Sequence, residues 1–131
     1  IGGWVGGYGG NEGQIGSMEY ACKVAGAKLV MVLGHEHCGA VKSAIDDVKL
    51  GNITAMLAKI KPALLKSQDF TGEKTSKNEA FVKHVCENNI RNTIEQIRAK
   101  SPILKEMETK GQIKIVGAYF DLSDSSLEFV Q

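Results

Sequence analysis

The sequence predicts a single α/β domain in which a mostly parallel sheet is flanked by helices and carries an antiparallel hairpin at its C-terminal edge. Helical and strand patterns alternate along the chain after residue 16. An apolar run at 29–33 leads directly into a glycine-bounded turn, and a second apolar run near the C-terminus is followed by a turn and a short partner strand. The 131 residues correspond to the length of one domain.

Composition excludes several broad classes of protein. The chain has 16 basic and 15 acidic residues, a net charge of +1 and 43% hydrophobic residues, which excludes a disordered, a collagen-like or a polybasic chain. We therefore expect no nucleic-acid partner. No apolar run approaches the ~20 residues of a membrane helix, and no signal peptide is recognisable, so we expect no membrane partner either. Three widely spaced cysteines favour a reducing, cytoplasmic location over a disulfide framework.

The first sixteen residues differ from the rest, because they contain eight of the fifteen glycines. Glycine at this density supplies no side chains for a core, so we expect residues 1–16 to form an irregular start and 17–131 to form the single domain. The spacing does not match the dinucleotide-binding fingerprint G-x-G-x-x-G. Trp4, Val5 and Tyr8 could still pack against a neighbouring surface, such as a subunit interface.

The pattern becomes regular at Ser17, which is expected to cap a helix that ends at Gly26. The buried stripe of this helix is predicted to comprise Met18, Ala21, Cys22 and Ala25. The following run, 29–33, is apolar at every position. It is therefore predicted to be a strand that is covered on both faces, as in a parallel sheet.

Further elements are predicted in order along the chain. A helix over 40–48 is followed by one capped by Asn52 and interrupted near Pro62, and then by a loop over 67–76. The longest helix is expected over 78–100, and its apolar stripe consists of Phe81, Val85, Ile90, Ile94 and Ile97. A short helix over 103–109 precedes a strand within 112–122, which pairs with 126–131 as a hairpin.

The segment GHEHCG, directly after the first strand, contains the residues with the clearest chemistry. Imidazole and thiolate are the donors that zinc prefers, and the spacing of His35 and Cys38 lets one tight turn present both to one ion. Gly34 and Gly39 would let the backbone pass close to the metal. Ligand sites in open α/β sheets lie where strands end in such turns. The residues alone thus make His35 and Cys38 candidate metal ligands.

Other readings of this segment remain open on the residues alone. Cys38 and His35 could form a nucleophile–base pair, although no third group that would orient the histidine is evident. Cys38 could also be a reduced structural cysteine in a glycine-bounded turn. A phosphate-binding P-loop is excluded, because no lysine follows the second glycine directly. Cys22 and Cys86 fall on predicted buried helix faces, and His84 on a helix surface.

GHEHCGAVKSA resembles the G-H-x-x-C-G motif of the β-class carbonic anhydrases. The longer block GSMEYACKVAGAKLVMVLGHEHCGAVKSAI is similar to the helix, strand and zinc loop of that family, and the tail KIVGAYFDLSDSSLEFV to its last strand and closing hairpin. Together these similarities cover most of residues 16–131. The resemblance implies a β-carbonic-anhydrase-like fold that lacks its first strand in this sequence.

The resemblance also implies a zinc cofactor and the reversible hydration of carbon dioxide to bicarbonate, the reaction of a lyase. In the family, zinc is held by Cys, His and Cys, and His35 and Cys38 match the second and third of these ligands. The first belongs to an upstream C-x-D-x-R element, which this sequence does not contain. No catalytic residue beyond the ligands is identifiable. The zinc site is therefore expected to be incomplete, and the isolated chain to be a poor carbonic anhydrase.

Several alternatives follow from the missing element. The third ligand could be His37, a recruited Cys22 or Cys86, or a residue of a partner chain, or the sequence could be a fragment of a longer protein. We expect the last of these. The resemblance implies a homodimer or higher homo-oligomer. Two alternative functions are a catalytically inactive member that keeps the fold and a hydrolase of CS2 or COS.

Overall fold

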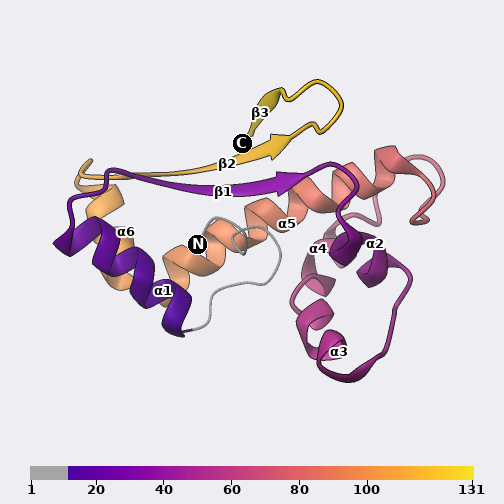
Figure 1. Ribbon diagram of the computed structural model, residues 1–131, viewed down its shortest axis with the longest axis horizontal. Coiled ribbons are helices and arrows are strands. Elements are labelled where there is room, and N and C mark those ends of the chain that lie inside the picture. Colours follow the sequence, from indigo (N-terminus) through magenta and orange to yellow (C-terminus); the bar gives the residue numbers. More distant parts are fainter. Residues whose placement is uncertain (1–11) are drawn as a thin grey trace.

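The computed structural model describes residues 12–131 (Figure 1). Within this range one α/β unit contains a small mixed sheet, which lies along the long helix α5. No helix in this part of the chain is both long and apolar enough to cross a bilayer. The elements are, in order, α1 (Glu12–Glu19), the π-helix η2 (Tyr20–Val24), β1 (Leu29–His35), α2 (Gly39–Ile45), α3 (Gly51–Ala58), α4 (Lys61–Lys66), α5 (Glu79–Lys100), α6 (Pro102–Thr109), β2 (Lys114–Phe120) and β3 (Leu127–Val130).

The sheet has the order β1-β2-β3. β1 and β2 are parallel over their full length, from the pair Leu29–Lys114 to the pair His35–Phe120. β3 runs antiparallel to β2 and covers only its second half, from Gly117 onward. The predicted α/β class and the C-terminal hairpin are thereby confirmed, although the described sheet holds one parallel and one antiparallel pair.

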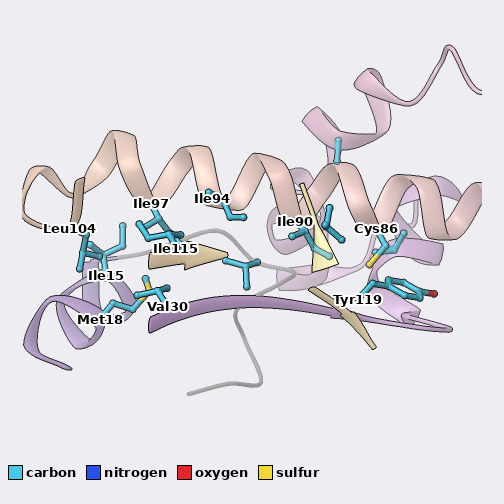
Figure 2. Close-up of a cluster of buried hydrophobic side chains, with 14 of the residues drawn as sticks. Ile15, Met18, Val30, Cys86, Ile90, Ile94, Ile97, Leu104, Ile115 and Tyr119 are labelled. Carbon is cyan, nitrogen blue, oxygen red and sulfur yellow. The ribbon is translucent and has the colours of Figure 1, made fainter. Parts of the chain in front are cut away.

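Helix α5 provides the central part of the core. The carboxamide of Asn78 accepts a hydrogen bond from the backbone N–H of Ala80 at 3.2 Å, which caps the helix at its predicted start. Figure 2 shows side chains of α5 pointing at β1 and β2. The entire predicted stripe is buried, and it consists of Phe81, Val85, Ile90, Ile94 and Ile97.

Two glycines allow α5 to approach the sheet closely. A Cβ atom on Gly117 of β2 would lie 2.5 Å from Cγ2 of Ile90, and one on Gly34 of β1 would lie 2.6 Å from Sγ of Cys86. Distances this short are incompatible with van der Waals packing. Both positions therefore require a residue without a side chain. Helix α5 fits against the strands because each position is occupied by glycine.

Other helices pack at the two ends of α5 (Figure 1). At one end, the hydroxyl of Ser101, which caps α6, donates a 2.5 Å hydrogen bond to the carboxylate of Glu19 in α1. Arg98 of α5 donates two hydrogen bonds, of 2.7 and 2.8 Å, to Glu108 of α6. At the other end, α2, α3 and the turn before α4 form a smaller apolar cluster, which contains Ala44, Leu57 and Ile60.

The first described helix corrects the predicted irregular start. It begins at Glu12, so residues 12–16 are helical, and the hydroxyl of Ser17 donates to the carbonyl of Gly13 at 2.8 Å instead of capping. A serine inside a helix can satisfy its hydroxyl this way, on the carbonyl four residues earlier. The expectations for Trp4, Val5 and Tyr8 lie outside the described residues.

Two further helix boundaries differ from the prediction. Asn52 does not cap α3, which begins at Gly51, and the N–H of Leu50 instead donates to the hydroxyl of Thr54 at 2.8 Å. The helix predicted over 40–48 ends at Ile45, and Asp47 adopts a φ of 55°, which a continuing helix does not allow. The predicted break near Pro62 is confirmed, because Pro62 lies in the first turn of a separate helix, α4.

One face of the sheet is not covered by described residues, which corrects the prediction that β1 is buried on both faces. Burial alternates along β1: residues that face α5 are buried, whereas Leu29 is 52% and Leu33 is 37% exposed. Phe129 of β3 is 62% exposed on the same side. We call this surface the open sheet face, and it comprises Leu29, Met31, Leu33, Val116, Phe120, Leu127 and Phe129.

Replacing Gly117 by alanine tests the close packing of α5. We expect Gly117→Ala to lower the free energy of unfolding by about 1–3 kcal/mol, because the new methyl group overlaps Ile90. Gly16→Ala in α1 is the matched control, since a Cβ there meets nothing within 4 Å. It should raise stability by about 0.5–1 kcal/mol through helix propensity. Urea denaturation measures both, and equal stability of the two variants would contradict the packing described.

Thiol labelling tests the burial of the cysteines. Cys22 and Cys86 are each 4% exposed, and burial raises the pKa of both thiols, that of Cys86 to about 12. Cys38 is half-buried at the start of α2. We expect a disulfide reagent at neutral pH to modify Cys38 rapidly and the other two only after unfolding by guanidinium chloride. Rapid modification of Cys86 in the folded protein would contradict this core.

Candidate metal centre

The candidate metal ligands lie in the tight turn that joins β1 to α2. β1 ends at His35, which pairs with Phe120 of β2, and the N–H of Glu36 donates to the carbonyl of Phe120 at 2.9 Å. α2 begins at Gly39, with Cys38 as its N-terminal flanking residue in an extended conformation. The predicted pair His35 and Cys38 thus lies at the carboxyl end of a parallel strand, the edge at which ligands bind in open α/β sheets.

The ring of His35 is oriented by the backbone of the turn. Nδ1 of the ring donates a hydrogen bond to the carbonyl of Glu36 at 2.8 Å. A carbonyl can only accept, so the bond fixes the proton on Nδ1 and leaves the lone pair of Nε2 available. Histidines that bind metals ordinarily donate their second ring nitrogen in this way. The ring is exposed to solvent, as an approaching ion requires.

Cys38 is half-buried and packs against the main core cluster. Together with His35 it gives one nitrogen and one sulfur donor, a chemistry that fits zinc. Among residues 12–131, however, no three His, Cys, Asp or Glu side chains come close enough together to hold a metal ion. The donor types therefore fit zinc, whereas the number of donors in this part of the chain does not complete a site.

Cys86 lies beneath the turn but remains a core residue. Its sulfur occupies the space that a side chain on Gly34 would need. Burial and the neighbouring Cys38 raise its pKa to about 12, and a backbone hydrogen bond from His35 opposes them. Gly34 thus has a steric reason to be glycine, whereas a Cβ on Gly39 would meet nothing within 4 Å.

His37 is engaged by the carboxylate of Glu79. Its backbone has a φ of 57°, and its ring is held at 3.1 Å from Oε2 of Glu79, the first residue of α5. Oε1 of Glu79 accepts a hydrogen bond from Nζ of Lys42 at 2.8 Å, and this contact lowers the pKa of Glu79. The carboxylate of Glu79 therefore connects the turn, α2 and α5.

Glu36 connects the turn to the opposite side. Its Oε1 accepts a 3.1 Å hydrogen bond from the N–H of Leu122, in the loop between β2 and β3. Neither Glu36 nor Glu79 was predicted as part of the site. A first-turn glutamate in α5 gives no sequence signal for a partner 42 residues earlier, so only the structure reveals this contact.

A separate groove of about 530 Å³ lies between α5 and the strands β2 and β3, and no residue of the turn lines it. Its two arginines are already engaged. Arg91 donates to the carbonyl of Gln131 at 2.6 Å, and Arg98 is paired with Glu108. The groove is therefore distinct from the candidate metal centre and offers no free cation from these two side chains.

Comparison with known proteins agrees with the fold and the motif. A carbonic anhydrase of Mycolicibacterium smegmatis is 32% identical over 119 residues, which is 87% of this chain and 54% of the relative. Carbonic anhydrase 2 of Mycobacterium tuberculosis is 29% identical over 115 residues, which is 84% of this chain and 52% of the relative. The chain spans about half the length of these curated relatives.

Solved structures show the same fold. A tetrameric β-carbonic anhydrase of Sordaria macrospora superimposes with a TM-score of 0.77 at 18% identity, over 92% of this chain and 60% of that one. The β-carbonic anhydrase CafA of Aspergillus fumigatus gives 0.76 at 21% identity, over 92% and 57%. The family model for carbonic anhydrase matches residues 1–127. With this match, this fold and the histidine–cysteine turn, the chain belongs to the β-class carbonic anhydrase family.

Proposed function

We propose that this chain supplies part of the zinc site of a carbonic anhydrase that interconverts carbon dioxide and bicarbonate. The observation that carries the proposal is the turn after β1, where His35 and Cys38 flank two residues and Nδ1 of His35 is tied to a backbone carbonyl. Nε2 of His35 and Sγ of Cys38 are the proposed donors. Membership of the family supports the reaction class.

Zinc held by protein ligands lowers the pKa of a bound water to about 7, which supplies a nucleophile at neutral pH. The residues of this chain would hold the zinc ion and orient its ligands. The carbonyl of Glu36 fixes the ring of His35, and the pairing of Glu36 with Phe120 fixes the start of the turn. Cys86 and Gly34 hold the turn against α5 from below. These contacts fix the conformation of the turn before zinc or substrate binds.

Catalytic zinc sites usually have three protein donors, so a third donor is required. Among residues 12–131, no three His, Cys, Asp or Glu side chains lie close enough together to hold a metal ion. We propose that another polypeptide segment provides it, either an upstream C-x-D-x-R element of the kind the family resemblance implies or a residue of a partner chain. The same observation favours one alternative function, a catalytically inactive member that retains the fold.

Zinc content and turnover of His35→Ala and Cys38→Ser test the assignment. Each variant should lose zinc affinity by more than about 100-fold, because loss of a supporting hydrogen bond alone typically costs 10–100-fold and these residues bind directly. His84→Ala, on the half-exposed surface of α5, is the matched control and should retain wild-type zinc content. Metal analysis and stopped-flow CO2 hydration on the same samples provide the measurements.

Two results would decide against the proposal in different ways. Zinc that persists in His35→Ala at the wild-type level would show that the ligand assignment is wrong. A wild-type chain that binds no zinc and shows no turnover, even after zinc is added, would instead show that His35 and Cys38 do not hold zinc without a donor from outside this chain.

The same chain is proposed to form a homo-oligomer. The open sheet face exposes Leu29, Leu33 and Phe129 to solvent, and β1 has no strand on its outer edge among the described residues. Parallel strands are ordinarily covered on both faces, and an open edge invites pairing with another chain. The Sordaria macrospora relatives are tetrameric. A second copy that packs on this face would cover it, and a strand of a second copy beside β1 would pair its open edge.

Leu29→Glu tests this proposal by placing a charge on the open sheet face. Light scattering at micromolar concentration should show a dimer or larger species for the wild type and a smaller species for Leu29→Glu, because a buried unpaired carboxylate opposes association. Leu65→Glu on α4, at a site 74% exposed and outside this face, should behave as the wild type. A monomeric wild type would rule the proposal out.

A further inference from the structure

We infer that Glu79 is a positioning residue that keeps His37 out of the metal-ligand set, so that His35 is the imidazole donor of the turn. The inference rests on the proposed function, because it concerns the same turn. Its observation is independent of the ligand motif: Glu79 belongs to α5 and lies 42 positions after His37.

The turn contains two imidazoles, and motif spacing alone does not prevent both from reaching one ion. His35 and His37 flank Glu36, and each is within three residues of Cys38. Any choice between them must come from what holds each ring. His37 has a left-handed backbone, with a φ of 57°, which a residue with a side chain keeps only where its surroundings hold it.

The surroundings of the two rings differ at every nitrogen. Nδ1 of His37 lies 3.1 Å from Oε2 of Glu79, and Nε2 lies 3.7 Å from Oε1 of Glu36, so both nitrogens face carboxylate oxygens. In His35, Nδ1 is bonded to a backbone carbonyl, and no residue within 12–131 forms a hydrogen bond with Nε2. Nε2 is thus available on His35, whereas on His37 Glu79 engages Nδ1 and the carboxylate of Glu36 faces Nε2 beyond hydrogen-bond distance.

Glu79 is itself held in place by a third element. Nζ of Lys42 in α2 donates to Oε1 of Glu79 at 2.8 Å, so the two oxygens of the carboxylate are divided between Lys42 and His37. Lys42 follows the turn by one helical turn of α2, and Glu79 begins α5. The Lys42–Glu79–His37 contacts thus fix the outer side of the turn from two helices.

Loss of the Glu79–His37 contact is expected to raise the affinity for a metal ion, although electrostatics alone would lower it. Neutralising Glu79 removes a negative charge near the turn and leaves Lys42 unpaired, and both changes should weaken cation binding by electrostatics alone. If Glu79 restrains His37, its neutralisation also frees an imidazole beside a site that has two donors. Three donors hold a transition metal better than two, so the affinity should rise instead.

Cobalt(II) provides the probe, because its visible absorption reports the number and type of donors. The full chain is titrated with Co²⁺ as the wild type, Glu79→Gln, His37→Ala and the double variant Glu79→Gln/His37→Ala. We expect Glu79→Gln to bind cobalt at least about 3-fold more tightly and with a changed spectrum, since an added imidazole alters the ligand field. The double variant should return to the wild-type spectrum and affinity.

Glu106→Gln is the matched control. Glu106 pairs with Lys110 at 2.8 Å on α6, at the opposite end of α5 from the turn, and its loss should leave cobalt binding unchanged (Figure 1). Equal affinity and spectrum for Glu79→Gln and the wild type would overturn the inference. So would a double variant that keeps the behaviour of Glu79→Gln, because the effect would then not pass through His37.

His35→Ala separates this inference from the proposed function. If His35→Ala abolishes cobalt binding in the wild-type background, the ligand assignment gains support whatever Glu79→Gln does. If the wild type binds no cobalt and Glu79→Gln does so through His37, the inference holds and the proposed zinc site of the native chain fails. If neither binds cobalt, both are overturned.

Discussion

The close contact between α5 and the paired strands β1 and β2 determines where the other features of the domain lie. Gly34 and Gly117 remove the side chains that would keep the helix away, and Cys86 and Ile90 occupy the space. Because Gly34 directly precedes His35, the same contact supports the candidate metal turn from below. The same contacts thus determine the packing of the core and the geometry of the turn, so a substitution that shifts α5 would also shift the turn.

Much of the fold could be predicted because its signals are local. The apolar stripe of α5, its extent and the C-terminal hairpin all follow from periodicity and turn composition within a few residues. Helix starts were predicted less well, since Ser17 and Asn52 look like caps in sequence but find other roles in the fold. The exposure of Leu29 depends on what covers this face of the sheet, and the local sequence does not specify that.

For the site, the sequence identified the turn but not its surroundings. His35 and Cys38 follow from donor chemistry and spacing, and their role as ligands stays a prediction. The contacts of Glu79 with His37 and of Glu36 with Leu122 join residues 42 and 86 positions apart, which spacing cannot reveal. Residues 12–131 contain no group of three metal donors, in a chain that spans about half the length of its curated relatives.

The parallel pairing of β1 with β2 has a consequence for how the protein matures. During synthesis β1 leaves the ribosome well before its partner, because all of α2–α6 lies between them in the chain. Pairings of such long range form late and slowly. Until β2 (Lys114–Phe120) has been synthesised, His35 and Cys38 follow a strand that lacks this parallel partner, so the geometry of the turn is set only once residues 114–120 have emerged.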